Sequence, residues 1–366
     1  MNNSLSPSGA SGKRVKSAED FKSLDPLQIV SQDQAQALDR LSEARFMLQI
    51  PGRWRAPLAV NVHAEELGVQ TTDWIASLGC PEWQVRRAHD FQASLYIGIP
   101  FASLGFEKAL LISKFTSLWL LWDDVEVENN LSPWRIELQH VLSGNPPADA
   151  SIYDLGWLAL FRELAASMSR SWLTALIQIM VVWTDEAHSQ AQMSRLFREQ
   201  GQLPTYSDCL LTRISTIGMY AMSRLIEYAM GVEFPEDFFR NPILRRMQTL
   251  SNVIVGLGND IFSFPKDYAD NFINVILVLA GEHSIPFAQS FARIIELFNE
   301  TVCEYDELEN KLPSFGSSWD PQIRIWVQEL RYCALGLTVW ESQAPRYNRQ
   351  KILCGGKVLE TGFLYL

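Results

Sequence analysis

Apolar residues recur at the spacing of an α-helix almost without interruption from Ile50 onward. Alternation of apolar and polar residues, which is typical of a half-buried strand, is rare, and no two-residue hairpin signal lies between alternating runs. Apolar residues make up 47% of the chain, enough to build a large core. The sequence therefore predicts an all-α fold, a bundle of roughly ten or more helices.

Several helix boundaries can be read from capping residues and prolines. Thr205-Tyr206-Ser207-Asp208 has the form of a capping box after Pro204. Ser132-Pro133 places a proline at a first helical position. The strongest predicted helices span residues 106–128, 154–169, 172–200, 207–230, 242–261, 287–310 and 322–344.

The predicted domain organisation is simple. Residues 1–22 are rich in Ser, Gly and Lys, which predicts a mobile N-terminal segment. A weak helical pattern over 33–48 predicts an extra N-terminal helix within residues 23–49. Residues 50–366 are predicted to form one domain, and no internal repeat of fixed period is present.

The charge, the lengths of the apolar runs and the cysteines indicate which partners and which cellular environment to expect. The net charge of −11 argues against nucleic acid or an anionic membrane. No apolar run reaches the roughly 18 residues that a membrane span needs. The five cysteines are scattered and odd in number, so we expect free, buried thiols in a reducing, cytoplasmic environment. The monomer and the homodimer both stay open.

One predicted helix ends in three carboxylates, Asp123, Asp124 and Glu128. Phe115, Trp119 and Asp123 share one helix face at i, i+4 and i+8, and Asp124 and Glu128 form a second stripe beside it. Three acids at the negative end of a helix repel each other unless a cation neutralises them. An exposed acidic helix end is the ordinary alternative. The apolar residues that lead into the acids favour the mouth of a pocket.

A second polar helix face follows late in the chain. Asn259, Ser263 and Asp267 are spaced i, i+4 and i+8, so they line one face if the helix continues. An amide, a hydroxyl and a carboxylate oxygen suit a hard cation such as Mg²⁺, which substrate phosphates usually complete. A capping region that is polar by chance is the alternative. The two faces together predict a magnesium site that holds a polyanion.

The chain resembles a microbial, fungal-type class I terpene synthase, a sesquiterpene cyclase, over about residues 50–366. Asp123, Asp124 and Glu128 resemble the aspartate-rich motif of the family. Asn259, Asp260, Ser263 and Asp267 resemble its second metal motif, and Arg346-Tyr347 after Trp340 resembles its C-terminal Arg-Tyr pair. The resemblance implies a single-domain helical bundle around a central apolar cavity.

Two positions depart from the family pattern. Asp267 stands where the second motif usually has Glu, which shortens the ligand by one methylene. Pro265 lies between Ser263 and Asp267, and a proline inside a helix removes a backbone hydrogen bond and favours a kink or an end. Both departures affect Asp267, so its assignment as a metal ligand has the weakest basis in the sequence.

The resemblance also implies the chemistry. Three Mg²⁺ ions would hold the diphosphate of an isoprenoid, with farnesyl diphosphate the favoured substrate. Concentrated positive charge stabilises the leaving diphosphate as the C–O bond breaks. The diphosphate-sensing arginine of the family corresponds to Arg213, and the other expected donors are Lys266, Arg346 and Tyr347.

The carbocation that remains needs a dry, aromatic-walled cavity. Phe115, Trp119 and Trp340 are candidates for that wall, although any one ring is as well explained as core. Thr216, Ile217 and Gly218 correspond to the place where the family breaks a helix, which could aim a carbonyl at the substrate.

Two other functions compete with a sesquiterpene synthase. A chain-elongating isoprenyl diphosphate synthase would want two aspartate-rich motifs, whereas the second motif here is Asn-Asp with Ser and Asp. A non-catalytic all-α interaction module gives no reason for the two oxygen-rich faces to meet.

Overall fold

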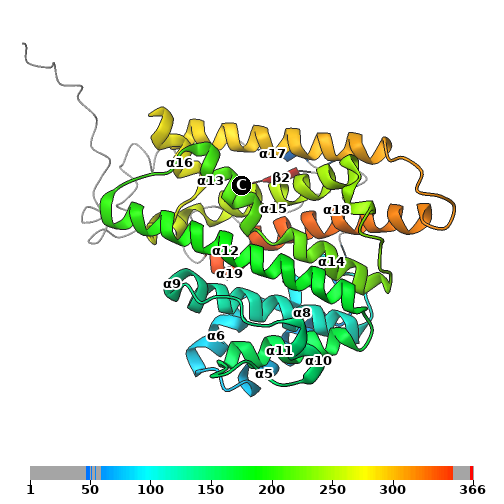
Figure 1. The fold of residues 1–366 in the computed structure, drawn as a ribbon. Helices are drawn as coiled ribbons and strands as arrows, with labels where there is room; N and C mark the ends of the chain where they lie inside the picture. Colours follow the sequence, from blue (N-terminus) through cyan, green and yellow to red (C-terminus); the bar gives the residue numbers. More distant parts are fainter. Residues whose placement is uncertain (1–46, 50, 52–53, 55–58, 349–362, 366) are drawn as a thin grey trace, which may run out of the picture.

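The computed structural model describes residues 47–49, 51, 54, 59–348 and 363–365. The described elements are almost all helices, which confirms the all-α prediction (Figure 1). The predicted mobile segment at residues 1–22 lies outside the described residues. So does most of the predicted helix within residues 23–49, of which the last three residues form a short strand.

Helices of the N-terminal half and the C-terminal half pack into one body (Figure 1). The N-terminal helices are α5 (Ala64–Ser77), α6 (Glu82–Asp90), α7 (Ala93–Tyr96), α8 (Phe106–Trp122), the π-helical turn η1 (Asp123–Val127), α9 (Glu128–Asn130), α10 (Leu138–Ser143), α11 (Ile152–Ala165) and α12 (Arg170–Gln200). The C-terminal ones are α13 (Tyr206–Thr216), α14 (Met219–Met230), the 3-10 turn η2 (Phe238–Arg240), α15 (Pro242–Ala269), α16 (Val275–His283), α17 (Phe287–Asn310), α18 (Asp320–Gln343) and α19 (Pro345–Asn348).

Each half has one central helix, α8 in the N-terminal half and α15 in the C-terminal half. The helix α8 packs against α5, α6 and α11. It is buried on most of its surface, which suits its mostly apolar sequence. The helix α15 packs against α13, α14, α16, α17, α18 and α19. The second oxygen-rich face lies on α15, and the acidic one begins at η1, which continues directly from α8. The fold therefore fixes both faces on or next to well-packed helices.

Several predicted helix boundaries differ from the observed ones. No helix begins at Pro133, because residues 131–137 are not helical and α10 begins at Leu138. Residues 207–230 form two helices, because α13 ends at Thr216 and α14 begins at Met219. Gly218 between them has φ +88°, a left-handed conformation that glycine adopts without strain. The helix predicted over 242–261 runs on through position 265 to Ala269, so the proline does not end it.

A short antiparallel strand pair, which the sequence pattern did not predict, joins the first and last segments that the structure describes. β1 (Met47–Gln49) pairs with β2 (Phe363–Tyr365), with Leu48 opposite Leu364. β1 also packs against α17. Backbone hydrogen bonds thus join the two strands to each other, and the packing of β1 on α17 holds them against the helical body.

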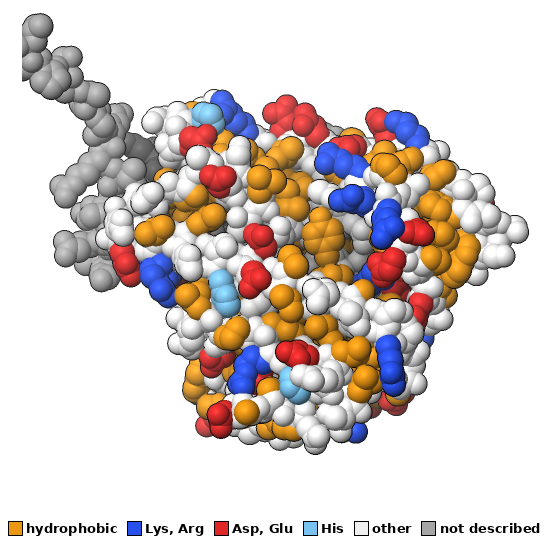
Figure 2. All heavy atoms as spheres, in the orientation of Figure 1, with side chains coloured by type: hydrophobic (Ala, Val, Ile, Leu, Met, Phe, Trp, Pro, Cys, Tyr) orange, Lys and Arg blue, Asp and Glu red, His pale blue; other side chains and the backbone are white. Residues whose placement is uncertain are grey.

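The surface charges, the hydropathy of the helices and the cysteines can be compared with the predictions about charge, membrane spans and buried thiols. Acidic and basic side chains are interspersed over the described part of the face in Figure 2. Among the described residues, no helix combines the length and apolar character needed to cross a membrane. Cys80, Cys209 and Cys333 are buried and unpaired, as predicted, whereas the unpaired Cys303 is exposed, contrary to the prediction of buried thiols.

A buried acid outside the oxygen-rich faces contributes to the packing of α12 and α14. Glu227 has no exposed surface. Trp172 Nε1 donates to it at 2.6 Å, and Arg224 Nη1 donates at 3.2 Å. Arg224 also donates to Glu236 at 2.7 Å. Burial raises the pKa of Glu227 to about 7, although Arg224 opposes the shift.

We predict that Glu227→Gln becomes more stable relative to the wild type as the pH rises. The pKa of Glu227 is raised from the usual 4.5, so the folded state binds more protons than the unfolded state between pH 4.5 and about 7. Stability contributed by this group is therefore lost as the pH rises through that window. Gln cannot ionise, so the difference in unfolding free energy should shift by about 1–3 kcal/mol towards the variant.

Thermal unfolding at about pH 5 and about pH 8 measures this difference. Glu236→Gln is the matched control, because it removes a carboxylate from the same arginine at an exposed position. A pH-independent difference between Glu227→Gln and the wild type would contradict the prediction.

Candidate active site

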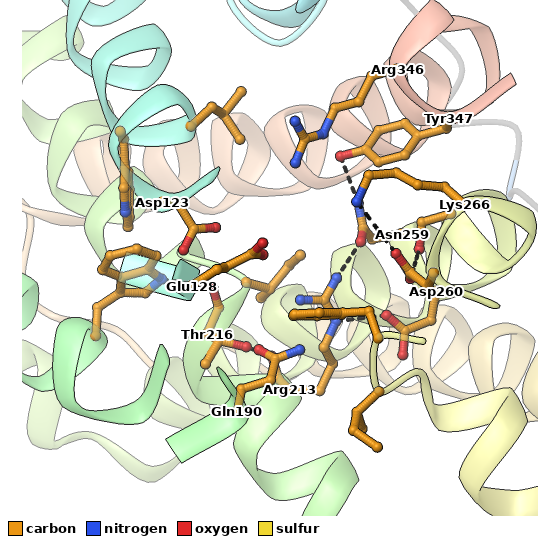
Figure 3. A pocket seen from close by; sticks show the side chains of 18 of the residues that line it. Asp123, Glu128, Gln190, Arg213, Thr216, Asn259, Asp260, Lys266, Arg346 and Tyr347 are labelled. Atoms are coloured by element: carbon orange, nitrogen blue, oxygen red, sulfur yellow. Dashed lines mark hydrogen bonds and ion pairs between the residues drawn. The ribbon is translucent and has the colours of Figure 1, made fainter. Parts of the chain in front are cut away.

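A pocket opens between η1 and the adjoining ends of α8 and α9, the helices α12 and α15, the break between α13 and α14, and α19. It contains about 760 Å³ of space without protein atoms, including the part open to solvent. Figure 3 shows Asp123 and Glu128 reaching into it from one side, opposite Asn259 and Lys266. The lining residues are Tyr96, Trp119, Leu120, Asp123, Glu128, Trp183, Gln190, Arg213, Thr216, Ile217, Met222, Asn259, Asp260, Ser263, Lys266, Asp267, Phe272, Ile273, Arg346 and Tyr347.

A π-helical turn sets the geometry of the acidic face. The backbone amide of Glu128 donates to the carbonyl of Asp123, five residues earlier. This wider turn aligns positions i and i+5. The regular-helix prediction, which grouped Glu128 with Asp124, is therefore wrong in register. Asp123 and Glu128 line the pocket together, and Asp124 does not.

Asp124 is instead held outside the pocket by two arginines. Arg346 binds both of its oxygens, and Arg87 Nε donates to Oδ2 at 2.7 Å. Burial alone would raise the pKa of Asp124, but Arg346 and Arg87 outweigh it and hold the pKa below its usual value. Asp124 thus stays ionised and fastens α19 and α6 to η1.

Asp123 and Glu128 are not bound by an arginine in this way. In the described part of the chain, neither makes a hydrogen bond or an ion pair with another side chain. Desolvation, then repulsion from Glu128 and Asp124, raises the pKa of Asp123 well above its usual value. Desolvation and repulsion from Asp124 raise the pKa of Glu128 to about 7. A bound divalent cation would offset this repulsion and favour the ionised forms of both carboxyls.

The second face lies on α15. Asn259, Ser263 and Asp267 all line the pocket, as their spacing indicates for a helix that continues past Pro265. Ser263 donates to Asp267 Oδ2, and Asn274 Nδ2 donates to the same oxygen at 3.0 Å. The predicted ligands of this face therefore lie together and are held by neighbouring side chains.

The amide of Asn259 has partners on both sides. Its Nδ2 donates to Glu341 Oε1 at 3.1 Å and to Tyr347 Oη at 3.1 Å. Arg213 Nη2 donates to its Oδ1, and Arg213 Nε donates to Asp260 Oδ1 at 2.7 Å (Figure 3). Asp260 also accepts from the backbone of Val275 at 2.9 Å.

The expected phosphate donors converge on the same space. Arg213, Lys266, Arg346 and Tyr347 all line the pocket. The Nζ of Lys266 lies 3.7 Å from Asp267 Oδ1, so its charge reaches the second face. Charge-assisted donors of this kind suit phosphate oxygens.

The aromatic wall differs from the sequence-based selection. Trp119 borders the pocket, but Phe115 and Trp340 do not. Phe115 packs within the core against Trp157, with ring centroids 4.9 Å apart. Trp340 donates through Nε1 to the carbonyl of Phe91 at 2.7 Å, behind the wall. Sequence periodicity places a ring on a helix face but cannot tell whether a neighbouring helix covers it.

Other lining residues were missed. The rings Tyr96, Trp183 and Phe272 face the pocket, and so does the amide of Gln190. Trp183 and Gln190 lie seven residues apart on α12, about two helical turns, so they share a face. That spacing was the available signal, although nothing in the sequence tied this face to the acidic ones.

Thr216 and Ile217 line the pocket at the helix break. The carbonyl of Thr216 accepts a hydrogen bond from Trp183 Nε1 at 2.7 Å. A Cβ at Gly218 would come within 2.8 Å of the Trp119 ring, so a glycine is needed here for space as well as for backbone conformation. The break therefore brings α13, α12 and α8 together at the pocket wall.

The oxygen atoms of these side chains are the type of ligand that a hard divalent cation prefers, but they do not form a complete coordination shell. Across the described ranges, no three His, Cys, Asp or Glu side chains are grouped closely enough to hold an ion alone. Asn259 and Ser263 add an amide and a hydroxyl oxygen, and Mg²⁺ usually keeps water or substrate phosphate in its shell. The two unpaired carboxyls opposite these donors fit a metal site that is completed by a bound anion.

Comparisons with known proteins agree with this architecture. Residues 114–304 match the family described as terpene synthase family 2, C-terminal metal binding. The chain is 28% identical over 150 residues to sesquiterpene synthase 6 of Postia placenta, covering 41% of this chain and 44% of that protein. It is 22% identical over 293 residues to sesquiterpene synthase Agr1 of Cyclocybe aegerita, covering 78% of this chain and 84% of that protein.

Solved structures show the same fold. A variant of cucumene synthase superposes with a TM-score of 0.66 at 21% identity, covering 80% of this chain and 99% of that one. Linalool/nerolidol synthase from Streptomyces clavuligerus gives a TM-score of 0.66 at 17% identity, covering 78% and 98%. The family match spans just over half of the sequence and contains both oxygen-rich faces. The chain belongs to terpene synthase family 2, whose C-terminal domain is metal-binding.

Proposed function

We propose that this protein is a magnesium-dependent sesquiterpene synthase, which ionises and cyclises farnesyl diphosphate and releases diphosphate. One observation carries the proposal. Asp123 and Glu128 face Asn259, Ser263 and Asp267 across one pocket that also holds cationic and aromatic side chains. The relatives named as sesquiterpene synthases support the choice of farnesyl diphosphate.

The polar end of the pocket would bind the diphosphate. Arg213, Lys266 and Arg346 place positive charge there, and the hydroxyl of Tyr347 offers a further donor. As the allylic C–O bond breaks, its electron pair stays on the diphosphate oxygen, and these groups stabilise the charge that develops. Three Mg²⁺ ions, held by the two faces, would supply Lewis-acid stabilisation of the same leaving group.

The apolar part of the pocket would hold the carbocation. Trp119, Trp183, Tyr96 and Phe272 present rings to the space, and Ile217 and Met222 add apolar surface. Ring faces attract positive charge, and the apolar wall excludes the water that would quench it. Loss of a proton from the cyclised cation would complete a hydrocarbon product.

The alternatives are less well supported. The family match and the Asn-Asp form of the second motif both disfavour a chain-elongating isoprenyl diphosphate synthase. An interaction module without catalysis does not account for two unpaired carboxyls turned into a pocket with cations. Incubation with geranyl, farnesyl and geranylgeranyl diphosphates, followed by mass spectrometry of the extracts, identifies the substrate.

We predict that MgCl₂ and inorganic diphosphate together raise the melting temperature by several degrees. A ligand at about 100 times its Kd adds about 2.7 kcal/mol to the stability of a folded state that alone binds it. Diphosphate alone and MgCl₂ alone should give smaller shifts, because each completes the site of the other. No shift with both present would count strongly against the proposed function.

We also predict that Asp123→Ala and Asn259→Ala each lower turnover by about 10²–10³-fold or more while the fold is kept. Each variant removes an oxygen from one of the two faces. Glu126→Ala is the matched control, because Glu126 belongs to the same π-turn but bonds to Asn130 and Ser132 outside the pocket. Gas chromatography of the product measures turnover, and circular dichroism checks that the fold is kept. Near-wild-type turnover of both variants would remove these residues from the metal site.

A further inference from the structure

Asn259 is the most constrained side chain of the second face, and one of its partners has no part in the chemistry above. An amide nitrogen carries two hydrogens. One acceptor of Asn259 Nδ2 is Glu341 Oε1 and the other is Tyr347 Oη, both at 3.1 Å. With both hydrogens engaged, Oδ1, which accepts from Arg213, is the atom of this pocket-lining amide that can still offer a lone pair to a cation.

Glu341 reaches this position from a different helix. It lies on α18, is 2% exposed and does not line the pocket. Gly258, which precedes Asn259, makes room for it. A Cβ there would come within 3.1 Å of Glu341 Oε2 and 3.0 Å of Thr338 Cγ2. The packing of α15 on α18 thus brings the Glu341 carboxyl beneath the second face.

The placement of Glu341 is energetically expensive. Its Oε2 is buried and has no hydrogen-bond partner in the described structure. A buried polar atom without a partner destabilises the folded state. An apolar residue would avoid this cost, so the hydrogen bond from Asn259 is what a carboxyl adds at this position.

We propose that Glu341 is a positioning residue, which holds the amide of Asn259 so that its oxygen is presented to the metal. The inference rests on the proposed function. If the amide turned over, Nδ2 would face the cation and could not bind it. Groups that orient a metal ligand in this way commonly change metal affinity by about 10–100-fold when they are removed.

The test compares Glu341→Leu with Glu341→Gln. Leu has a similar size but no acceptor, whereas Gln keeps one acceptor oxygen for Asn259 Nδ2. The readout is the MgCl₂ concentration that gives half of the thermal shift at a fixed concentration of inorganic diphosphate. We expect this concentration to rise by about tenfold in Glu341→Leu, and Glu341→Gln to restore most of the affinity.

Ser342→Ala is the matched control. Ser342 is a buried neighbour on α18 that donates only to its own helix, at Val339. It should leave the MgCl₂ dependence unchanged. A contribution of Glu341 to stability alone would shift the melting temperature without MgCl₂ but not the half-saturating concentration.

An exchange of groups tests the contact directly. Asn259→Asp places two acceptors face to face, whereas Asn259→Asp combined with Glu341→Gln restores a donor, now on residue 341. The double variant should bind Mg²⁺ more tightly than Asn259→Asp alone. This comparison also decides the matter if Glu341→Leu does not fold.

Two results would overturn the inference. One is an unchanged MgCl₂ dependence in a folded Glu341→Leu variant, and the other is a double variant no better than Asn259→Asp. Absence of any shift in the wild type would instead reject the proposed function. The two failures are therefore separate.

Discussion

Carboxylates in a poorly solvated pocket need a cation, and this requirement organises the site. Burial disfavours charge unless a partner offsets it. Asp124 has fixed partners in Arg87 and Arg346, which keep it ionised and join η1 to α6 and α19. Asp123 and Glu128 have none among the described residues, and both have raised pKa values. The acidic motif thus contains two kinds of carboxylate. Asp124 is ionised and stabilises the fold, whereas Asp123 and Glu128 need a bound cation to stabilise their ionised forms.

The sequence predicted the fold class and the second face because both depend on helical spacing. Residues four apart on α15 share a face whatever they pack against. Position 265 tested that reasoning. The helix continues there, so Asp267 keeps its place beside Ser263. The acidic face was harder to predict, because the spacing of apolar residues does not indicate where a π-turn interrupts a helix. The wider turn brings Glu128 into line with Asp123, whereas a regular helix would have placed it in line with Asp124.

Contacts between distant segments could not be read from the sequence. Arg346 lies 222 residues from Asp124, and Glu341 lies 82 residues from Asn259. The aromatic wall shows the same limit. Trp119 and Phe115 share a face of α8, yet α11 covers Phe115 through Trp157, while Trp119 remains beside the pocket. Helical spacing decides which residues are neighbours on a helix, and only tertiary packing decides which of them stay uncovered.

Arg213 connects the two ends of the pocket. Its guanidinium binds Asn259 and Asp260 on the second face, while its own helix ends three residues later at Thr216. The Thr216 carbonyl is bound by Trp183, and Gly218 packs closely against Trp119. The segment that follows Arg213 is therefore in contact with two rings of the apolar wall. Because Gly218 leaves no space for a side chain, this segment has little room to shift without moving Trp119. The contacts of the polar and apolar ends of the pocket thus meet at a single helix break.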